Sequence, residues 1–329
     1  MKVTSLHLAA IAVAAVPDLE VVAIRPPLFR TPDFQFAGVL DANGKHWVVQ
    51  YPLHAGAGAM IEADGAVVAS LAQELAAGHL PFDVIHPAGY AQVKEGRAQV
   101  FPEPIGKTKD FVGLTQTDAE ELGSAIGAIH SLRTEVLTRV GMPSYSASQW
   151  RERLGTELDE LTGAAEIPAL LEKRWRSVLD ESTLWEFKPR VLHGDLAADR
   201  FLWSQGKVSC TVGFGDAHVG DPAEDIAAIL GALSDDLTDP FLSSYEDIIG
   251  GDLDDAFFER ASFMGEFALA RWMNFGIRTA DESIMSDAQT MLRDLSESLT
   301  PRAEFEFEVE DTSDVLPASN ASFSTKDPL

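Results

Sequence analysis

The chain has few of the residues that build disulfides, metal clusters or nucleic-acid surfaces. Its 329 residues include one cysteine, Cys210, which lies in an apolar run and can form no disulfide within the chain. No group of Cys and His has the spacing of a zinc site, and neither G-x-S-x-G nor H-E-x-x-H occurs. A net charge of −27 argues against nucleic acid and against an anionic membrane surface as partners.

The chain also lacks a long hydrophobic run, since no stretch reaches the ~18 consecutive apolar residues that a membrane span needs. The apolar segment Leu6–Val16 has two interpretations. It could be a short signal peptide, or a helix that places Leu6, Ala9 or Ala10, Val13 and Val16 on one face. The single basic residue before it and the interruption at His7 favour the helix. We therefore predict a cytoplasmic protein without a membrane partner.

At 329 residues the chain exceeds the usual size of a single hydrophobic core, so two lobes are expected. In residues 1–104 the pattern is that of β-strands with one long alanine-rich helix. Pro26 and Pro27 should end the first strand, and Asn43-Gly44 should turn a hairpin. The expected strands are Leu19–Arg25, Phe34–Asp41, Lys45–Tyr51, Val84–Val93 and Arg97–Phe101, and the expected helix is Ala57–Ala77.

Residues 105–300 are mostly helical by the same criterion and should form the second lobe, after a proline-bracketed linker at Phe101–Ile105. Residues 301–329 form an acidic tail. Within it, Glu304–Glu310 alternates strictly between charged and apolar residues, as a docked strand would, and the remainder is typical of disordered chain. A protein partner could bind this tail. The expected helices are Asp118–Leu132, Ser146–Leu161, Ile167–Leu179, Ala223–Leu233, Asp239–Ile249, Asp254–Ile277 and Asp281–Leu299.

The stretch from Val191 to Ile226 contains two motifs, one on either side of a predicted β-hairpin. The first is HGDL at His193–Leu196, and the second is GDPAED at Gly220–Asp225. With the chain length and the lobe order, they resemble the aminoglycoside and macrolide phosphotransferases over roughly residues 1–300. The resemblance implies an α+β, two-lobe protein-kinase-like fold, with a small antiparallel sheet and one long helix followed by a larger helical lobe. It also implies transfer of the γ-phosphoryl group of ATP or GTP to a hydroxyl of a small molecule.

The resemblance assigns roles to residues of both motifs. Asp195 matches the aspartate that accepts the proton of the attacking hydroxyl in kinases, although it could also brace its own loop. Asp225 would tie down that loop by accepting backbone N–H bonds, and Asp221 would cap the helix that follows it. His193 would pack the loop against the helical lobe.

Residues of the first lobe match positions that contact the nucleotide in this family. Phe101 and Glu103 belong to the linker whose backbone contacts the adenine. Gln50 occupies the position of a phosphate-binding lysine or arginine, and a neutral amide can bond a phosphate but brings no charge. Asp64, or alternatively Glu62, is the acid of the long helix that pairs with this cation in kinases.

Two metal-binding positions of the family are changed. Arg200 replaces the asparagine of the catalytic loop, and Gly213 replaces the aspartate of the D-F-G-like turn. Neither a guanidinium nor a hydrogen atom can coordinate Mg²⁺, which requires oxygen ligands. Arg200 could instead face a phosphate, and Asp199 and Asp216 could supply displaced metal oxygens.

Two functions therefore remain open from the sequence. One is a small-molecule phosphotransferase with Asp195 as its base, and the other is a catalytically silent kinase-fold protein that binds a nucleotide, a metabolite or a protein partner. The acceptor could be cationic, because thirteen Asp or Glu residues and no Lys or Arg occur between Lys207 and Arg260. The alternative is a solvated acidic face on a protein that is acidic throughout.

Overall fold

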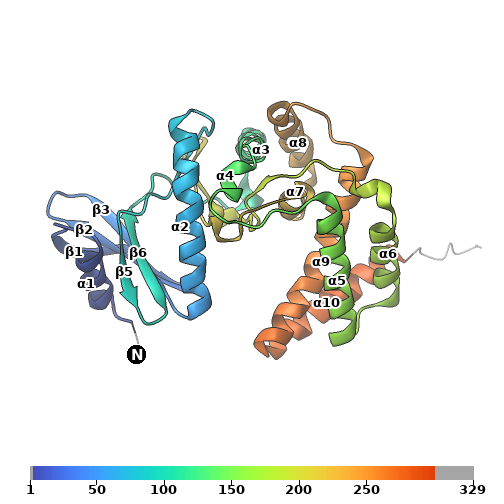
Figure 1. Ribbon diagram of the computed structural model, residues 1–329, viewed down its shortest axis with the longest axis horizontal. Helices are drawn as coiled ribbons and strands as arrows, with labels where there is room; N and C mark the ends of the chain where they lie inside the picture. Colours follow the sequence, from blue (N-terminus) through green and yellow to red (C-terminus); the bar gives the residue numbers. More distant parts are fainter. Residues whose placement is uncertain (1–2, 301–329) are drawn as a thin grey trace, which may run out of the picture.

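A five-stranded antiparallel sheet forms most of the first lobe in the computed structural model, which describes residues 3–300 (Figure 1). Its strand order is β1-β2-β3-β6-β5, and the expected turn at Asn43-Gly44 joins β2 to β3. The strands are β1 (Val21–Arg30), β2 (Phe34–Asp41), β3 (His46–Pro52), β5 (Gly89–Val93) and β6 (Gly96–Pro102). The features predicted for the tail, residues 301–329, lie outside the described residues.

Two strands differ from the sequence prediction. β1 continues past Pro26 and Pro27, because it is the edge strand of the sheet and its register shifts there, so the ladder needs no N–H from either proline. The strand predicted at Val84–Val93 is interrupted at Pro87. Its two parts are β4 (Asp83–Val84) and β5, and β4 pairs in parallel with β9 (Lys207–Thr211) of the second lobe.

Helix α1 (Ser5–Ala15) packs against the sheet of the first lobe. The predicted helix is confirmed, but the face suggested by the spacing is only partly buried, since Leu6 and Val13 are 75% and 51% exposed. Leu8 and Ile11 are buried instead. Almost every residue of this segment is apolar, so the spacing of apolar residues could not identify the face that the sheet covers.

Helix α2 (Ala55–Ala76) stands between the sheet and the helical lobe (Figure 1). It approaches the β5–β6 turn so closely that a Cβ atom at Gly58 would lie 2.1 Å from the carbonyl oxygen of Glu95. Val67 and Leu71 of the same helix belong to the core of the second lobe. Among the described residues, α2 is also the one helix whose length and apolar composition would suit a membrane span, a property that core helices share.

The second lobe is helical, with two small sheets beside the first lobe. β7 (Arg190–Leu192) pairs with β10 (His218–Gly220), and β9 lies between β4 and β8 (Phe201–Ser204), which confirms the predicted hairpin. The fifth predicted helix begins at Asp235 rather than at Asp239. The helices are α3 (Gln116–His130), α4 (Glu135–Thr138), α5 (Ala147–Ala164), α6 (Ala169–Asp180), α7 (Ala223–Leu230), α8 (Asp235–Ile249), α9 (Asp255–Thr279) and α10 (Glu282–Leu299).

Buried apolar side chains form two large cores and one small cluster. One core lies between α1 and the sheet, and the other joins the helices of the second lobe to α2. The small cluster contains Val48, Ile85 and Phe101, with Phe36 and Val212 packed against it. It therefore connects the sheet with the end of the β8–β9 hairpin, where the D-F-G-like turn begins.

Candidate functional site

The HGD loop follows β7 and passes very close to the D-F-G-like turn. Gly194 has a φ of +83°, and a Cβ atom there would lie 2.3 Å from the carbonyl oxygen of Asp216, so only glycine fits. His193 is fully buried, and its Nε2 lies 3.0 Å from the carbonyl oxygen of Val212. Its ring packs on Phe214 with a centroid separation of 4.5 Å. His193 therefore holds the loop against the D-F-G-like turn.

Asp225 lies beneath this loop with its carboxylate buried. It accepts hydrogen bonds from the backbone N–H groups of His193, at 2.8 Å, and Gly194, at 3.0 Å. These are the contacts that the sequence predicts. Its Oδ2 also lies 3.0 Å from Nε2 of His130 on α3, whose Nδ1 lies 2.8 Å from the hydroxyl of Tyr245. Burial opposes ionisation of Asp225, but the hydrogen bond and charge of His130 outweigh it and lower the pKa of this carboxyl.

Asp221 is also buried and lies two residues before the start of α7. Its Oδ1 accepts from the backbone N–H of Ala223 at 3.1 Å, but the N-cap of α7 is Pro222, so the predicted cap is displaced by one residue. Its Oδ2 accepts from Nε of Arg260 on α9 at 2.7 Å, a partner that sequence reasoning missed. The only signal was that Arg260 is the first basic residue after Lys207. This pair fastens the start of α7 to α9.

The side chain of Asp195 is bonded to Arg200. The guanidinium donates to Oδ2 of Asp195 through Nη2 and Nε, and Nε also lies 3.1 Å from the Asp195 carbonyl oxygen. Nη1 of Arg200 donates to Oδ2 of Asp199 at 3.1 Å. The structure thus brings together three residues that the sequence singled out, with the cation of Arg200 between two carboxylates.

Gly213 makes room for this arginine. A Cβ atom at Gly213 would lie 3.1 Å from Cδ and 3.3 Å from Nε of Arg200, so the arginine lies over the glycine where an aspartate side chain would begin. Asp216 stands nearby, and burial together with the charge of Asp195 raises its pKa. Among residues 3–300, no group of three or more His, Cys, Asp or Glu side chains is placed to hold a metal ion. The residues present do not fit a Mg²⁺ site of the kinase type.

Gln50 and Asp64 lie on β3 and α2, and a third polar residue stands between these elements. Nε2 of Gln99, on β6, donates to Oε1 of Gln50 at 2.6 Å. Asp64 accepts from the backbone N–H of Phe214 at 2.8 Å, and its burial raises its pKa to about 6. The alternative acid, Glu62, is exposed and pairs with Arg97. Sequence reasoning missed Gln99, which strand pairing places directly opposite Gln50.

The linker residues Phe101 and Glu103 differ in their environment. Phe101 is buried in the small apolar cluster with Val48 and Ile85. The backbone N–H of Glu103 donates to the carbonyl oxygen of His46 at 3.0 Å, and its carboxylate lies 3.2 Å from Nδ1 of the same residue. That N–H is therefore engaged within the first lobe.

A hollow of about 330 Å³ lies beside the HGD loop. Gly194, Gly215 and Asp216 line it from the two loops that flank Asp195. The remaining wall belongs mainly to the second lobe and is formed by Met142, Pro143, Tyr145, Trp150, Arg153, Glu157, Ala217, His218, Glu224 and Arg271. We refer to this space as the loop hollow.

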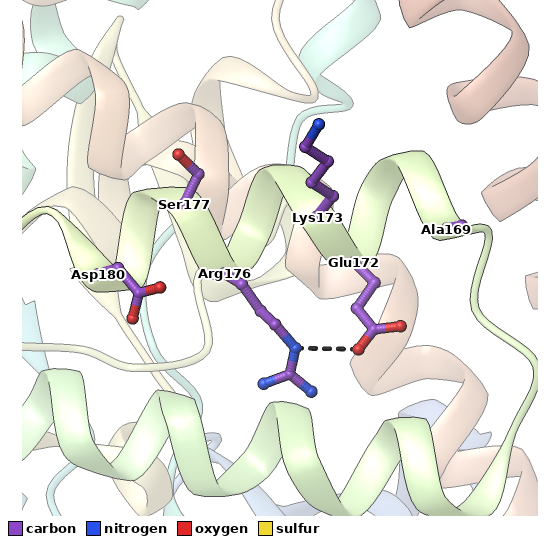
Figure 2. Close-up of a pocket in the computed structure, with 6 residues that line it drawn as sticks. All are labelled: Ala169, Glu172, Lys173, Arg176, Ser177 and Asp180. Carbon is purple, nitrogen blue, oxygen red and sulfur yellow. Dashed lines mark hydrogen bonds and ion pairs between the residues drawn. The ribbon is translucent and has the colours of Figure 1, made fainter.

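A second depression lies on the outer face of α6 (Figure 2). All of the residues that line it belong to that single helix, and Arg176 forms an ion pair with Glu172 across it. One helix cannot enclose a ligand, and no residue that the sequence singled out lies there. The loop hollow is therefore the better candidate for a binding site.

Solved structures of kinase-like phosphotransferases share this fold. A macrolide 2'-phosphotransferase from Brachybacterium faecium superposes with a TM-score of 0.73 at 19% identity, covering 88% of this chain and 98% of that one. The GDP complex of aminoglycoside 2'-phosphotransferase-IIIa superposes with a TM-score of 0.71 at 18% identity, covering 90% of this chain and 99% of that one. The predicted two-lobe, protein-kinase-like α+β fold is confirmed.

The sequence identifies the family within this fold. The profile of the phosphotransferase enzyme family matches residues 41–261, and the chain belongs to that family. Viomycin phosphotransferase of Streptomyces vinaceus is 27% identical over 182 residues, which are 53% of this chain and 60% of that protein. The chain thus spans less than two thirds of this relative.

The contacts of Asp225 predict a large effect on stability. We expect Asp225→Ala to lower the free energy of unfolding by about 1–3 kcal/mol or more, because it leaves two buried backbone N–H groups and His130 without an acceptor. Urea denaturation followed by circular dichroism measures this change. Asp247→Ala, at an exposed position on α8, is the matched control and should differ from the parent by less than about 0.5 kcal/mol. Equal stability of the two variants would contradict the role of Asp225.

The raised pKa of Asp64 predicts a pH-dependent stability. The folded state binds this proton more tightly than the unfolded state, whose aspartate has its ordinary pKa of 3.8. The stabilisation is complete below pH 3.8 and is lost as the pH rises through about 6. Asp64→Asn keeps a carbonyl acceptor for Phe214 and does not ionise. We expect it to exceed the parent in stability at pH 8 by on the order of 2–3 kcal/mol, and to match it near pH 4.

Thermal unfolding at both pH values tests this expectation. Asp64→Leu is the control, because it also removes the charge but leaves the N–H of Phe214 without an acceptor, so it should lose stability at both pH values. A parent that is as stable as Asp64→Asn at pH 8 would show that the buried carboxyl carries no such cost.

Proposed function

We propose that this protein binds a nucleoside triphosphate, ATP or GTP, between its lobes, and that Arg200 holds the phosphates without a divalent metal ion. The observation that carries the proposal is the placement of the Arg200 guanidinium over Gly213. In the kinase fold this location belongs to the metal ligands and the phosphates that they bind. A guanidinium presents several N–H donors and a permanent charge, so it can bind phosphate oxygens directly.

The adenine or guanine base would lie against the small apolar cluster that includes Phe101, near the linker at Glu103. One structural relative is a GDP complex, which supports a nucleotide as the ligand. Gln50 would contribute a hydrogen bond to a phosphate, but no charge. These ligands are present in the cytoplasm, which we propose as the location of the protein.

The transfer step would use Asp195 as the base for a hydroxyl of a small-molecule acceptor. In the structure the guanidinium of Arg200 donates two hydrogen bonds to Oδ2 of this carboxylate, so one of its two oxygens is already engaged. Without a metal ion to neutralise the transferred phosphoryl group, transfer would be slow or absent. The second candidate function, a catalytically silent kinase-fold protein that binds a nucleotide, a metabolite or a protein partner, is favoured by this same pairing.

Nucleotide binding with and without Mg²⁺ tests the proposal. We expect ATP or GTP to bind with an affinity that survives EDTA, and Arg200→Ala to weaken it about ten- to a hundredfold, because a charge-assisted contact is lost. Arg133→Ala, at an exposed position away from the site, should leave the affinity unchanged. Isothermal titration calorimetry measures all three proteins. Mg²⁺-dependent turnover by the parent, abolished in Asp195→Asn, would overturn the metal-free proposal.

The close contact between Arg200 and Gly213 gives a separate prediction about Mg²⁺ binding. Gly213→Asp alone should not create a metal site, because its Cβ would crowd the arginine. Aspartate tolerates the left-handed backbone of this position better than most residues do. We therefore expect metal binding to require the pair Arg200→Asn and Gly213→Asp, and Gln50→Lys to add phosphate affinity. Mn²⁺ binding followed by electron paramagnetic resonance distinguishes the single, double and triple variants. Equal metal affinity in Gly213→Asp alone and in the double variant would show that Arg200 does not prevent metal binding.

A further inference from the structure

The linker between the lobes contains two prolines that flank Glu103. Pro102 and Pro104 have no backbone N–H to donate. The N–H that lies between them, that of Glu103, already donates to the carbonyl oxygen of His46 on the first lobe at 3.0 Å. From Pro102 to Pro104, no backbone N–H is therefore free to bind a ligand.

The residue before these prolines is part of the sheet. Phe101 pairs with Val48 of β3. The hydrogen bonds of an antiparallel ladder recur at every second residue, so the bond between Glu103 and the sheet directs the N–H of Phe101 toward Val48. This N–H is engaged as well, and residues 101–104 leave no backbone donor for a ligand.

The carbonyl oxygen of Pro102 remains able to accept. The backbone of Pro102 faces the side of β6 on which Val100 accepts from the N–H of Ala88 at 2.8 Å. On that side, continuing the register of β5 and β6 would bring Pro87 opposite Pro102, and Pro87 has no N–H to donate. A ligand beside the linker would therefore meet a carbonyl acceptor here and no donor.

The next backbone N–H belongs to Ile105, where the chain turns toward the β8–β9 hairpin. The carbonyl oxygen of Ile105 accepts from Oγ of Ser209 at 2.5 Å. Lys107 then exchanges two backbone hydrogen bonds with Trp203, at 2.8 and 3.0 Å. The linker thus offers acceptors along its first part and a backbone donor only after Pro104.

The two purines differ in the edge that they would turn toward these carbonyls. Guanine carries two adjacent donors, N1–H and the N2 amino group, whereas adenine carries one donor, the N6 amino group, beside the acceptor N1. Carbonyl oxygens can pair both guanine donors, and the O6 atom lies at the end of that edge, where water can reach it. The N1 atom of adenine lies in the middle of its edge and would face an acceptor, which lowers affinity.

We propose that the linker selects guanine nucleotides over adenine nucleotides, and that Pro102 and Pro104 set this preference. The inference rests on the proposed function for the placement of the base beside the linker. It goes further by naming the base, which phosphate contacts with Arg200 do not distinguish. The small apolar cluster at Phe101 contacts either purine, so the polar edge of the base decides between them.

Three nucleoside diphosphates that differ only in the base test the preference. Isothermal titration calorimetry of the full chain, in EDTA, measures the binding of GDP, IDP and ADP. We expect GDP to bind at least tenfold more tightly than ADP, because guanine pairs one donor more and does not turn an acceptor toward the carbonyls. IDP keeps N1–H but lacks the amino group, so its affinity should lie between the two. ADP binding that equals or exceeds GDP binding overturns the proposal.

Variants assign the preference to the prolines. The double variant Pro102→Ala and Pro104→Ala adds two backbone N–H groups, so we expect the ratio of GDP affinity to ADP affinity to fall about tenfold. Pro168→Ala, at a half-buried proline before α6, is the matched control and should leave the ratio unchanged. A linker that is merely loosened would weaken all three nucleotides alike. A ratio that the double variant does not change overturns the proposal.

Guanosine and adenosine, measured on the same samples, separate this inference from the proposed function. If guanosine binds more tightly than adenosine and the phosphates add no affinity, the phosphate-binding role of Arg200 is wrong and the linker preference stands. If the diphosphates bind through Arg200 with equal affinity for both bases, the linker preference is wrong and the proposed function stands.

Discussion

The buried carboxylate of Asp225 determines where the HGD loop can lie. A charge without contact to water is costly unless hydrogen bonds replace its hydration, and here two backbone N–H groups of the loop and the ring of His130 do so. The loop, α3 and α7 are therefore joined at one point. Gly194 allows the loop to pass close to the carbonyl oxygen of Asp216. Asp195 is the next residue, so these contacts fix the position of its backbone.

Arg200 and Gly213 are sterically coupled, because the arginine side chain lies over the glycine. In a kinase the corresponding residues bind metal ions, and those ions neutralise the acids and phosphates around them. Here Asp195, Asp199 and Asp216 lie near one another, and the charges of all three act on Arg200. Under the proposed function, a guanidinium attached to the chain would replace a diffusible cation, and a Cβ atom at Gly213 would lie 3.1 Å from its Cδ. An aspartate at position 213 would crowd Arg200, and without Arg200 the three acids would lack this neighbouring cation.

Local patterns in the sequence predicted the elements, whereas contacts between distant residues could not be read from it. The β8–β9 hairpin and α2 follow from signals within a few residues, so they were predicted correctly. The pairing of Asp221 with Arg260 joins residues far apart in sequence, and only packing of α7 on α9 brings them together. The resemblance could name Arg200 and Gly213 as departures, but it could not show that one side chain lies over the other.

The first lobe has a neutral side chain at Gln50, whereas the segment after the HGD loop carries the positive charge of Arg200. Gln50 accepts a hydrogen bond from the neutral amide of Gln99, and burial raises the pKa of the Asp64 carboxyl to about 6. This arrangement needs no cation from β3. The positive charge available to a phosphate is then that of Arg200, which Asp195 already holds. Under the proposed function these two uses of one guanidinium are linked, since a phosphate that draws Arg200 away also releases the carboxylate of Asp195. Phosphate binding would therefore also make Asp195 available as a base. The free energy needed to separate Arg200 from Asp195 would oppose both events.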